Sequence, residues 1–338
     1  MSKITLLDRK KNFYKANLHC HTTCSDGKMT PEQIKEIYKA KGYSIVAFTD
    51  HEHLLDQSHL NDDQFLAITS CEVAIKEFPH LSTLVKTDMK VCHLNFYSKD
   101  PHNVDTPCYS SVYDHFINDE IKDRIVHSCG EYEREYGADG ISAMIKEANK
   151  KGFLVSYNHP RWSLENATDY LGYEGIWAVE IYNSECNLTG IYEYDINVYD
   201  DFLRADNRLA CTACDDNHGA DSMFGGFIMV NAEKLDYYAV IDALEKHNFY
   251  ASTGPVIKEL YVEDGKAYLS FEGGEYALMS TKGRRASRKL AQNPNGENTV
   301  CFDIKMETDE YIRFDVVGSD GKRANTCAYF IDELCALS

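Results

Sequence analysis

The sequence predicts an α/β protein followed by a smaller β domain. Up to about residue 255, short apolar runs typical of strands alternate with helix-length amphipathic stretches, which is the pattern of a parallel sheet or barrel. From about residue 256, strand-like runs are separated by turn signals such as DG, NPNG and SDGK. We therefore divide the chain into a domain of residues 1–255 and a small, antiparallel, β-sandwich-like domain of residues 256–338.

The elements of the first domain follow one another along the chain. Thr30 as N-cap, Pro31 in the first turn and Gly42 as terminator predict a helix. Two more helices are predicted in GISAMIKEANKKG and DYYAVIDALEKHN. The predicted strands are KANLHCH, YSIVAFTDH, FLAITSCEVAI, MKVCHLNFYS, FLVSYNHP, WAVEIYN and RLACTACDDNH. Residues 98–139 lack a clear periodicity and are expected to form a long insertion.

Composition excludes several classes of function. The 338 residues carry a formal net charge of −19, which opposes binding to duplex nucleic acid or to an anionic membrane surface. No apolar run approaches the roughly 18 residues of a membrane span, and the first residues do not resemble a signal peptide. We expect a cytoplasmic protein whose 12 cysteines are reduced thiols, with those of CTAC packed as small apolar side chains. The oligomeric state stays open.

Histidines and carboxylates recur where the predicted strands end. His19 and His21 form an HxH pair on one strand, so both imidazoles face the same side. Imidazole and carboxylate ligands together suit zinc, iron or manganese. Nine such residues exceed what one tetrahedral ion needs, and they fit two or three ions with a bridging carboxylate. The predicted ligands are His19, His21, Asp26, His51, Glu72, His93, His159, Asp216 and His218.

The ordered segments HCHTTCSDG, FTDH, the strand glutamate, HLN, NHP and DDNH resemble the motif set of the polymerase-and-histidinol-phosphatase (PHP) superfamily. The resemblance covers residues 17 to about 255, and the tail beginning FYASTGP resembles the extension of bacterial stand-alone members, predicted metal-dependent phosphoesterases. The family implies a distorted (β/α)7 TIM-like barrel and usually three metal ions. A carboxylate at Asp26, where histidinol phosphate phosphatases often have histidine, points away from that subfamily.

The resemblance also implies a distribution of the ligands among the ions. It places His19, His21 and Asp216 on one ion, and Glu72 between that ion and a second. His93 and His159 complete the second ion, and Asp26, His51 and His218 hold the third. In DDNH we choose Asp216 over Asp215, because the DxH spacing puts Asp216 and His218 on the same side.

These residues predict hydrolysis of a small phosphate ester, such as a nucleotide or nucleoside bisphosphate. Divalent ions make the pocket cationic and lower the pKa of bound water to about 7, which supplies hydroxide as the nucleophile. A phosphomonoesterase is favoured over a phosphodiesterase. The expected catalytic residues are Glu72, His93, Asp216 and His218. The expected substrate contacts are Arg161, Asn183 and His53.

Two other functions stay open. An amidohydrolase-like site would keep the metals but cleave an amide or cyclic amidine, and it is disfavoured because no strand-end motif contains lysine. The second open function is that of a regulatory module that binds metal but does not catalyse a reaction. The basic run KGRRASRK is either a solvated loop or a loop that attracts an anionic substrate.

Overall fold

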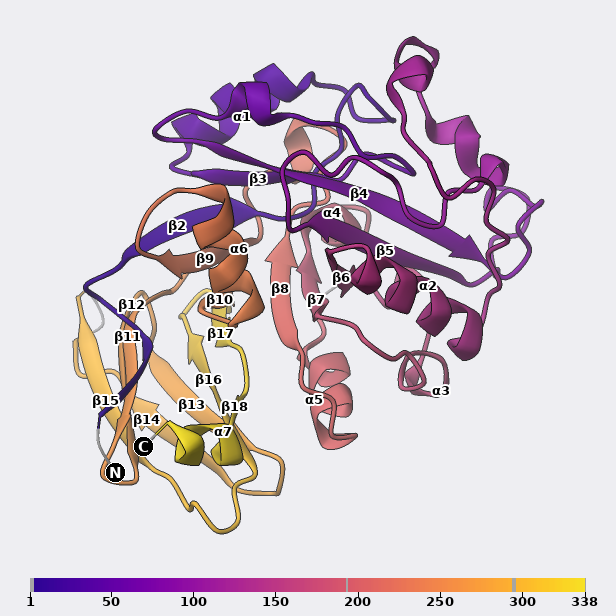
Figure 1. Ribbon diagram of the computed structural model, residues 1–338. Helices are drawn as coiled ribbons and strands as arrows, with labels where there is room; N and C mark the ends of the chain where they lie inside the picture. The colour runs from indigo at the N-terminus through magenta and orange to yellow at the C-terminus, as the bar shows by residue number, and fades with distance from the viewer. Residues whose placement is uncertain (1–2, 193, 294–295, 338) are drawn as a thin grey trace.

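The computed structural model describes residues 3–192, 194–293 and 296–337 and shows a mixed α/β protein (Figure 1). A 14-stranded sheet has the order β14-β13-β16-β17-β10-β9-β2-β3-β4-β5-β6-β7-β8, with β18 beside β16. A four-stranded sheet has the order β1-β11-β12-β15. The predicted class, α/β with an antiparallel C-terminal part, is confirmed at this level.

The first part of the chain contributes strands of the large sheet, and the predicted ligands lie on some of these strands or directly after them. These strands are β2 (Asn12–Asn17), β3 (Ile45–Phe48), β4 (Leu66–Lys76), β5 (Val91–Ser98), β6 (Phe153–Tyr157), β7 (Ala178–Asn183), β8 (Ala210–Cys214), β9 (Phe227–Ala232) and β10 (Phe249–Ser252). β2, β3 and β4 pair in parallel, as do β6, β7 and β8.

The expectation of successive parallel strands was wrong for β5, and β9 was not among the predicted strands. β5 runs antiparallel to both β4 and β6, and β9 runs antiparallel to β2. Among the described residues β8 forms a ladder with β7 alone, so a closed barrel is not seen. An isolated parallel bridge between Cys20 and Asn217 nevertheless brings the segments after β2 and β8 together, and His21 N–H donates to the Asn217 carbonyl at 3.1 Å.

Helices pack on the strands that they follow or precede: α1 contacts β3, α2 contacts β6, α5 contacts β7 and α6 contacts β9. The predicted cap of α1 is confirmed, since the Thr30 side chain accepts from the Gln33 backbone N–H and the Gln33 side chain accepts from the Thr30 backbone N–H. No helix among the described residues is long and apolar enough to cross a membrane. The helices are α1 (Pro31–Ala40), α2 (Ala138–Lys150), α3 (Ala167–Tyr170), α4 (Ser184–Leu188), α5 (Ile196–Arg204), α6 (Tyr237–Glu245) and α7 (Ile331–Ala336).

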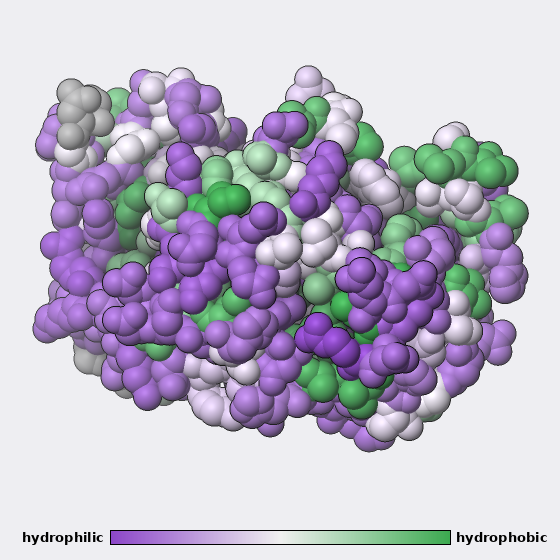
Figure 2. All heavy atoms as spheres, turned by 90° about the horizontal axis from the view of Figure 1, so that it is seen from above, coloured by the Kyte–Doolittle hydropathy of each residue, from purple (hydrophilic) through white to green (hydrophobic). Residues whose placement is uncertain are grey.

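The predicted insertion at residues 98–139 crosses the upper part of the molecule as two 3-10 helices, η2 (Ser111–Phe116) and η3 (Asp119–Arg124) (Figure 1). It is tied to the turn after β2, because Asn118 donates from its backbone to the Cys24 carbonyl and from Nδ2 to the Thr23 carbonyl. Seen from above, this face is mainly hydrophilic, with apolar side chains gathered toward its right-hand end (Figure 2).

The C-terminal part is antiparallel, as predicted, but its sheets also include strands from before residue 256. β1 (Ile4–Leu7) pairs with β11, so the first strand of the chain lies in the four-stranded sheet. β10 pairs with β17, which continues the large sheet into the C-terminal part. The strands are β11 (Val256–Glu263), β12 (Lys266–Glu272), β13 (Tyr276–Thr281), β14 (Ala286–Leu290), β15 (Asn298–Asp303), β16 (Tyr311–Val317), β17 (Arg323–Thr326) and β18 (Tyr329–Phe330).

The basic run at residues 282–289 lies in the β13–β14 hairpin, and two of its cations form ion pairs with carboxylates of this protein. Lys282 lies 2.8 Å from the Glu310 carboxylate, and Arg285 lies 3.0 Å from that of Asp309. Neither cation lines the cavity described below.

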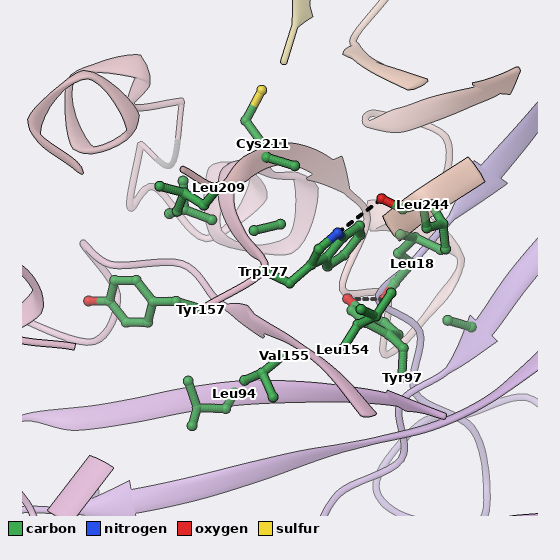
Figure 3. Close-up of a cluster of buried hydrophobic side chains, with 14 of the residues drawn as sticks. Leu18, Leu94, Tyr97, Leu154, Val155, Tyr157, Trp177, Leu209, Cys211 and Leu244 are labelled. Atoms are coloured by element: carbon green, nitrogen blue, oxygen red, sulfur yellow. Dashed lines mark hydrogen bonds between the residues drawn. The ribbon is translucent and has the colours of Figure 1, made fainter. Parts of the chain in front are cut away.

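A buried apolar cluster holds the strands of the site together (Figure 3). Trp177 donates from Nε1 to the Leu244 carbonyl at 3.0 Å, and the Tyr97 hydroxyl donates to the Leu18 carbonyl at 2.9 Å. Both large rings are therefore buried without leaving their polar atoms unpaired. The bond to Leu18 fixes the backbone directly before His19. Cys211 lies in the same cluster, and the twelve cysteines are free thiols, as predicted.

Candidate metal centre

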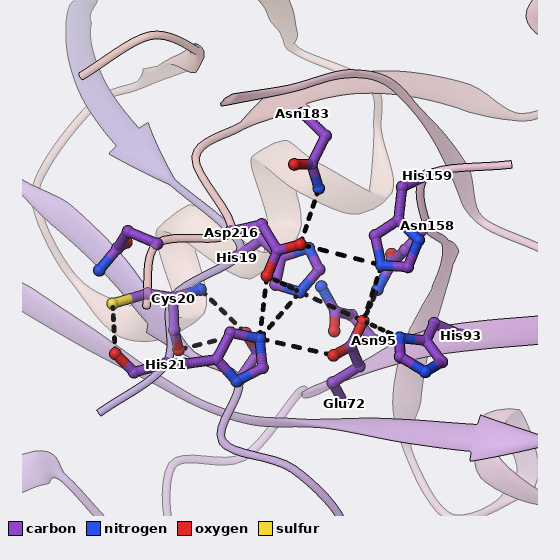
Figure 4. Close-up of polar contacts among 12 residues, drawn as sticks. His19, Cys20, His21, Glu72, His93, Asn95, Asn158, His159, Asn183 and Asp216 are labelled. Atoms are coloured by element: carbon purple, nitrogen blue, oxygen red, sulfur yellow. Dashed lines mark hydrogen bonds and ion pairs between the residues drawn. The ribbon is translucent and has the colours of Figure 1, made fainter. Parts of the chain in front are cut away.

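The structure brings all nine predicted ligands into one cluster. Figure 4 shows its inner part, with His19, His21, Glu72, His93, His159 and Asp216. They come from separate segments of the chain: the stretch after β2, the ends of β3, β6 and β8, and the interior of β4 and β5. His159 and Asp216 adopt left-handed φ angles of 26° and 53°. Such backbone conformations are costly for residues other than glycine and gather at functional sites.

Glu72 lies at the centre of the cluster. Its side chain is 1% exposed, and both carboxylate oxygens are surrounded by imidazoles. Five ring nitrogens lie 3.0–3.4 Å from these oxygens, those of His19, His21, His51, His93 and His159. A carboxylate in this position can bridge two cations that are held by different histidines.

Asp216 closes one side of the cluster. Its Oδ1 lies 3.1 Å from His19 Nε2 and 3.0 Å from His21 Nε2. Asp215 points away, as the alternation along the strand predicts: it accepts three backbone N–H bonds from residues 224–226 and a 2.8 Å bond from the Tyr38 hydroxyl. The two adjacent acids therefore have different roles, one facing the cluster and one anchoring the turn.

Asp26 forms an outer group with two histidines. Its carboxylate lies 3.5 Å from His51 Nε2 and 3.4 Å from His218 Nε2, and a third imidazole, that of His21, lies 3.8 Å away. The Asp26 side chain is 39% exposed, whereas Glu72 is buried. The outer group thus lies at the mouth of the site.

The donor set fits divalent cations. Bonds of about 2.0–2.2 Å from one ion hold neighbouring ligand atoms about 3.0–3.5 Å apart, which is the spacing around Glu72 and Asp216. Two buried ring nitrogens of the predicted ligands, His21 Nδ1 and His159 Nδ1, have no hydrogen-bond partner among the described residues. Orphaned lone pairs of this kind are costly in a folded protein unless a cation or water satisfies them.

The charges of the metal-free cluster stabilise one another. Burial alone would raise the pKa of Glu72, but the nearby His93 and His19 hold it well below its usual range. Burial would lower the pKa of His21, yet the contacts with Asp216 and Glu72 raise it to about 10. The metal-free cage therefore holds protons that compete with cations for the same atoms.

Glu180 is a site residue that the sequence reasoning missed. Its Oε1 lies 3.0 Å from His19 Nδ1, and its Oε2 accepts from the His159 backbone N–H at 3.1 Å. A carboxylate on the far nitrogen of a ligating imidazole fixes the ring and its tautomer. The signal was present, because Glu180 is the single charged residue in the apolar strand WAVEIYN.

The three predicted substrate contacts lie around the cluster rather than in its cavity. Asn183 is buried and donates from Nδ2 to Asp216 and to Glu180, both at 3.0 Å. His53 is buried, with Nδ1 at 2.6 Å from the His51 carbonyl. Arg161 is 56% exposed and pairs with Asp195 at 2.9 Å. Their contact with a substrate stays a prediction.

A cavity of about 320 Å³ opens onto the cluster and reaches Asp26, Glu72 and Asp216. Its wall includes residues that sequence reasoning did not single out as pocket residues: Lys76, Thr83, Val91, Phe116, Trp162, Glu185, Cys186 and Thr189. Trp162 packs its ring 4.9 Å from that of His93 and 5.0 Å from that of His159. The insertion thus contributes directly to the site through Phe116.

Comparison with known proteins gives matches among solved structures only; no family description and no curated sequence matches the chain. A two-domain protein from Bacteroides vulgatus, containing a predicted PHP-like metal-dependent phosphoesterase, is 14% identical, with 96% of each chain covered and a TM-score of 0.45. A protein from Bifidobacterium adolescentis described as a metal-dependent phosphoesterase is 16% identical, with 68% of this chain and 96% of that one covered and a TM-score of 0.36.

A third solved structure is an amidohydrolase from Chromobacterium violaceum with bound sulfate and no metal. It is 13% identical, with 60% of this chain and 87% of that one covered and a TM-score of 0.36. The solved structures that this chain resembles therefore include PHP-like metal-dependent phosphoesterases and an amidohydrolase.

Proposed function

We propose that this protein is a metal-dependent hydrolase of the PHP type that cleaves a small phosphate monoester. The observation that carries the proposal is the Glu72 carboxylate, buried among five imidazoles at the end of a small cavity. On this proposal the strands β2 to β8 correspond to the distorted seven-stranded barrel of PHP proteins, with the Cys20–Asn217 bridge joining the two ends.

Two or three divalent ions, zinc, iron or manganese, would be held by the three groups of ligands around Glu72, Asp216 and Asp26. When bound, such ions polarise the phosphoryl oxygens and lower the pKa of water. The protein's own contribution is positional. Glu180 and Asn183 orient His19 and Asp216 from behind, and Trp162 covers the inner histidines. The volume of about 320 Å³ favours a small ester over a polymeric one.

The amidohydrolase alternative is less well supported by the ligand set. Lys76 does end β4 and lines the cavity, but its described contacts are with aromatic rings rather than with the metal ligands. Glu72 occupies the centre of the cluster, where a ligand shared by two ions would lie, so a lysine has no place there.

Release of inorganic phosphate tests the proposal. Protein purified without chelators, loaded with Mn²⁺, Zn²⁺ or Fe²⁺, is assayed on nucleotides, sugar phosphates and p-nitrophenyl phosphate, with an amide panel alongside. We expect metal-dependent phosphate release that is abolished by chelation, by Glu72→Gln and by His93→Ala. His59→Ala, an exposed histidine paired with Glu32, is the matched control and should leave the rate unchanged. Wild-type rates in the first two variants, with normal metal content, would overturn the proposal, as would turnover of amides alone.

A further inference from the structure

Lys76 is a buried lysine inside the metal-site cavity. It is 6% exposed, ends β4 and lines the same cavity as Glu72 and Asp216. Because side chains alternate along a strand, Glu72 and Lys76 project from the same face of β4, about 13 Å apart in backbone position. Lys76 therefore lies on the face of β4 that carries Glu72, at the end of the strand where the β4–β5 connection begins.

The ammonium group of Lys76 has no carboxylate partner among the described residues. Its described contacts are the rings of Tyr113, 5.3 Å away, and Phe116, 5.7 Å away. Buried lysines are rare unless an anion pairs with them. Burial lowers the pKa of Lys76, and the more distant Glu52 offsets this only in part. An anion that entered the cavity would supply the missing partner.

A second cavity of about 640 Å³ adjoins the first at Lys76, which lines both together with Thr83 and Phe116. His80 and His115 also line it, and the described lining includes no aspartate or glutamate. The two cavities share Lys76, Thr83 and Phe116 in their linings, so they adjoin at the buried lysine; we call the two together the Lys76 path.

Exposed apolar side chains lie beside this path, and two of them, Leu81 and Leu84, line the second cavity. The β4–β5 connection exposes Leu81 by 42%, Leu84 by 89% and Val85 by 80%. Figure 2 shows apolar side chains at the right-hand end of the upper face, the side on which Figure 1 places this connection. The path thus offers the ammonium group of Lys76 with apolar surface near it.

We propose that the second cavity binds a remote anionic group of the substrate, a phosphate or a carboxylate, and that Lys76 contacts this group directly. The inference rests on the proposed function, because it assigns the scissile phosphate to the metal ligands. The substrate class is then a phosphate ester whose leaving group carries a second anion, joined by an apolar spacer. Lys76 selects this class over simple monoesters.

Binding of phosphonates tests this inference without hydrolysis, since their C–P bond is not an ester. Calorimetry on the Mn²⁺-loaded protein compares alkylphosphonates with alkane-1,ω-diylbisphosphonates from propane to hexane, and with ω-phosphonoalkanoates of the same lengths. We expect a doubly anionic probe of some length to bind at least about tenfold more tightly than the matching alkylphosphonate, the factor of one charged hydrogen bond. The two probe series separate a phosphate-binding from a carboxylate-binding site.

Variants identify the residue responsible. Lys76→Met should remove the preference and leave alkylphosphonate binding unchanged, and Lys76→Arg should retain the preference. Lys86→Met, on the connection that follows β4 and paired with Asp88 at 2.9 Å, is the control and should behave as the wild type. The inference is overturned if no probe length shows a preference, or if Lys76→Met weakens both kinds of probe equally. Absence of ester hydrolysis with the binding preference intact would instead refute the proposed function alone.

Discussion

Replacing Glu180 by glutamine should weaken metal binding while leaving every predicted ligand in place. Glu180 Oε1 faces His19 Nδ1 at 3.0 Å, so the proton resides on Nδ1 and His19 Nε2 is free to face Glu72 and Asp216. If the new amide group turned its NH₂ toward His19, it would favour the opposite tautomer, with the proton on Nε2. If the NH₂ turned the other way, it would face the His159 backbone N–H and Asn183 Nδ2, which both donate to Glu180 in the wild type. Three donors would then lie together without an acceptor.

Either orientation costs one charge-assisted hydrogen bond, about 1.5–3 kcal/mol. We therefore expect metal affinity to fall about 10- to 100-fold, the usual effect of losing a carboxylate behind a ligating histidine. Competition for Zn²⁺ or Mn²⁺ against a chromophoric chelator measures this, and thermal unfolding of the metal-free protein checks the fold. Glu174→Gln changes an exposed glutamate shortly before the same strand and should have no effect. Equal affinities in both variants and the wild type, with the fold intact, would refute the reasoning.

Three further outcomes are expected. Metal binding should release protons, and metal affinity should rise with pH. Burial lowers the pKa of His21 but neighbouring carboxylates raise it to about 10, so below that pH a proton must leave His21 before a metal binds. Equal calorimetric enthalpies of metal binding in buffers of different ionisation enthalpy would contradict this. Asp26→Asn should lower the metal content by one ion in elemental analysis, and an unchanged content would argue against the outer group. Tyr38→Phe removes the donor to Asp215 and should cost about 1–3 kcal/mol in urea unfolding; an unchanged midpoint would contradict it.

The clustering of the strand-end histidines and carboxylates could be predicted because their signal is local. HxH and DxH place two side chains on one face of a strand whatever the sheet around them, and Asp216 could be separated from Asp215 for this reason. The direction of β5 could not be read in the same way, because a period of two is the same in parallel and antiparallel strands. The connection at residues 77–90 did carry a hint, since it lacks the helix that a parallel crossover usually contains.

Other features depended on contacts between distant parts of the chain. β1 pairs with β11 across about 250 residues, which no local pattern indicates. Lys76 was missed by a single position, because the strand was predicted to end at Ile75 whereas β4 ends at Lys76. Phe116 lies in a segment without periodicity, and its place in the cavity follows from how the insertion folds back onto the turn after β2.

Anomalous diffraction from crystals soaked in Mn²⁺ or Zn²⁺ tests the central claim most directly. We predict two or three peaks at the absorption edge of the soaked metal, with the Glu72 carboxylate between two of them and further ligands from His19, His93 and Asp216. Ordered imidazoles with no anomalous peak inside their cluster would contradict the claim that this arrangement of residues is a metal centre.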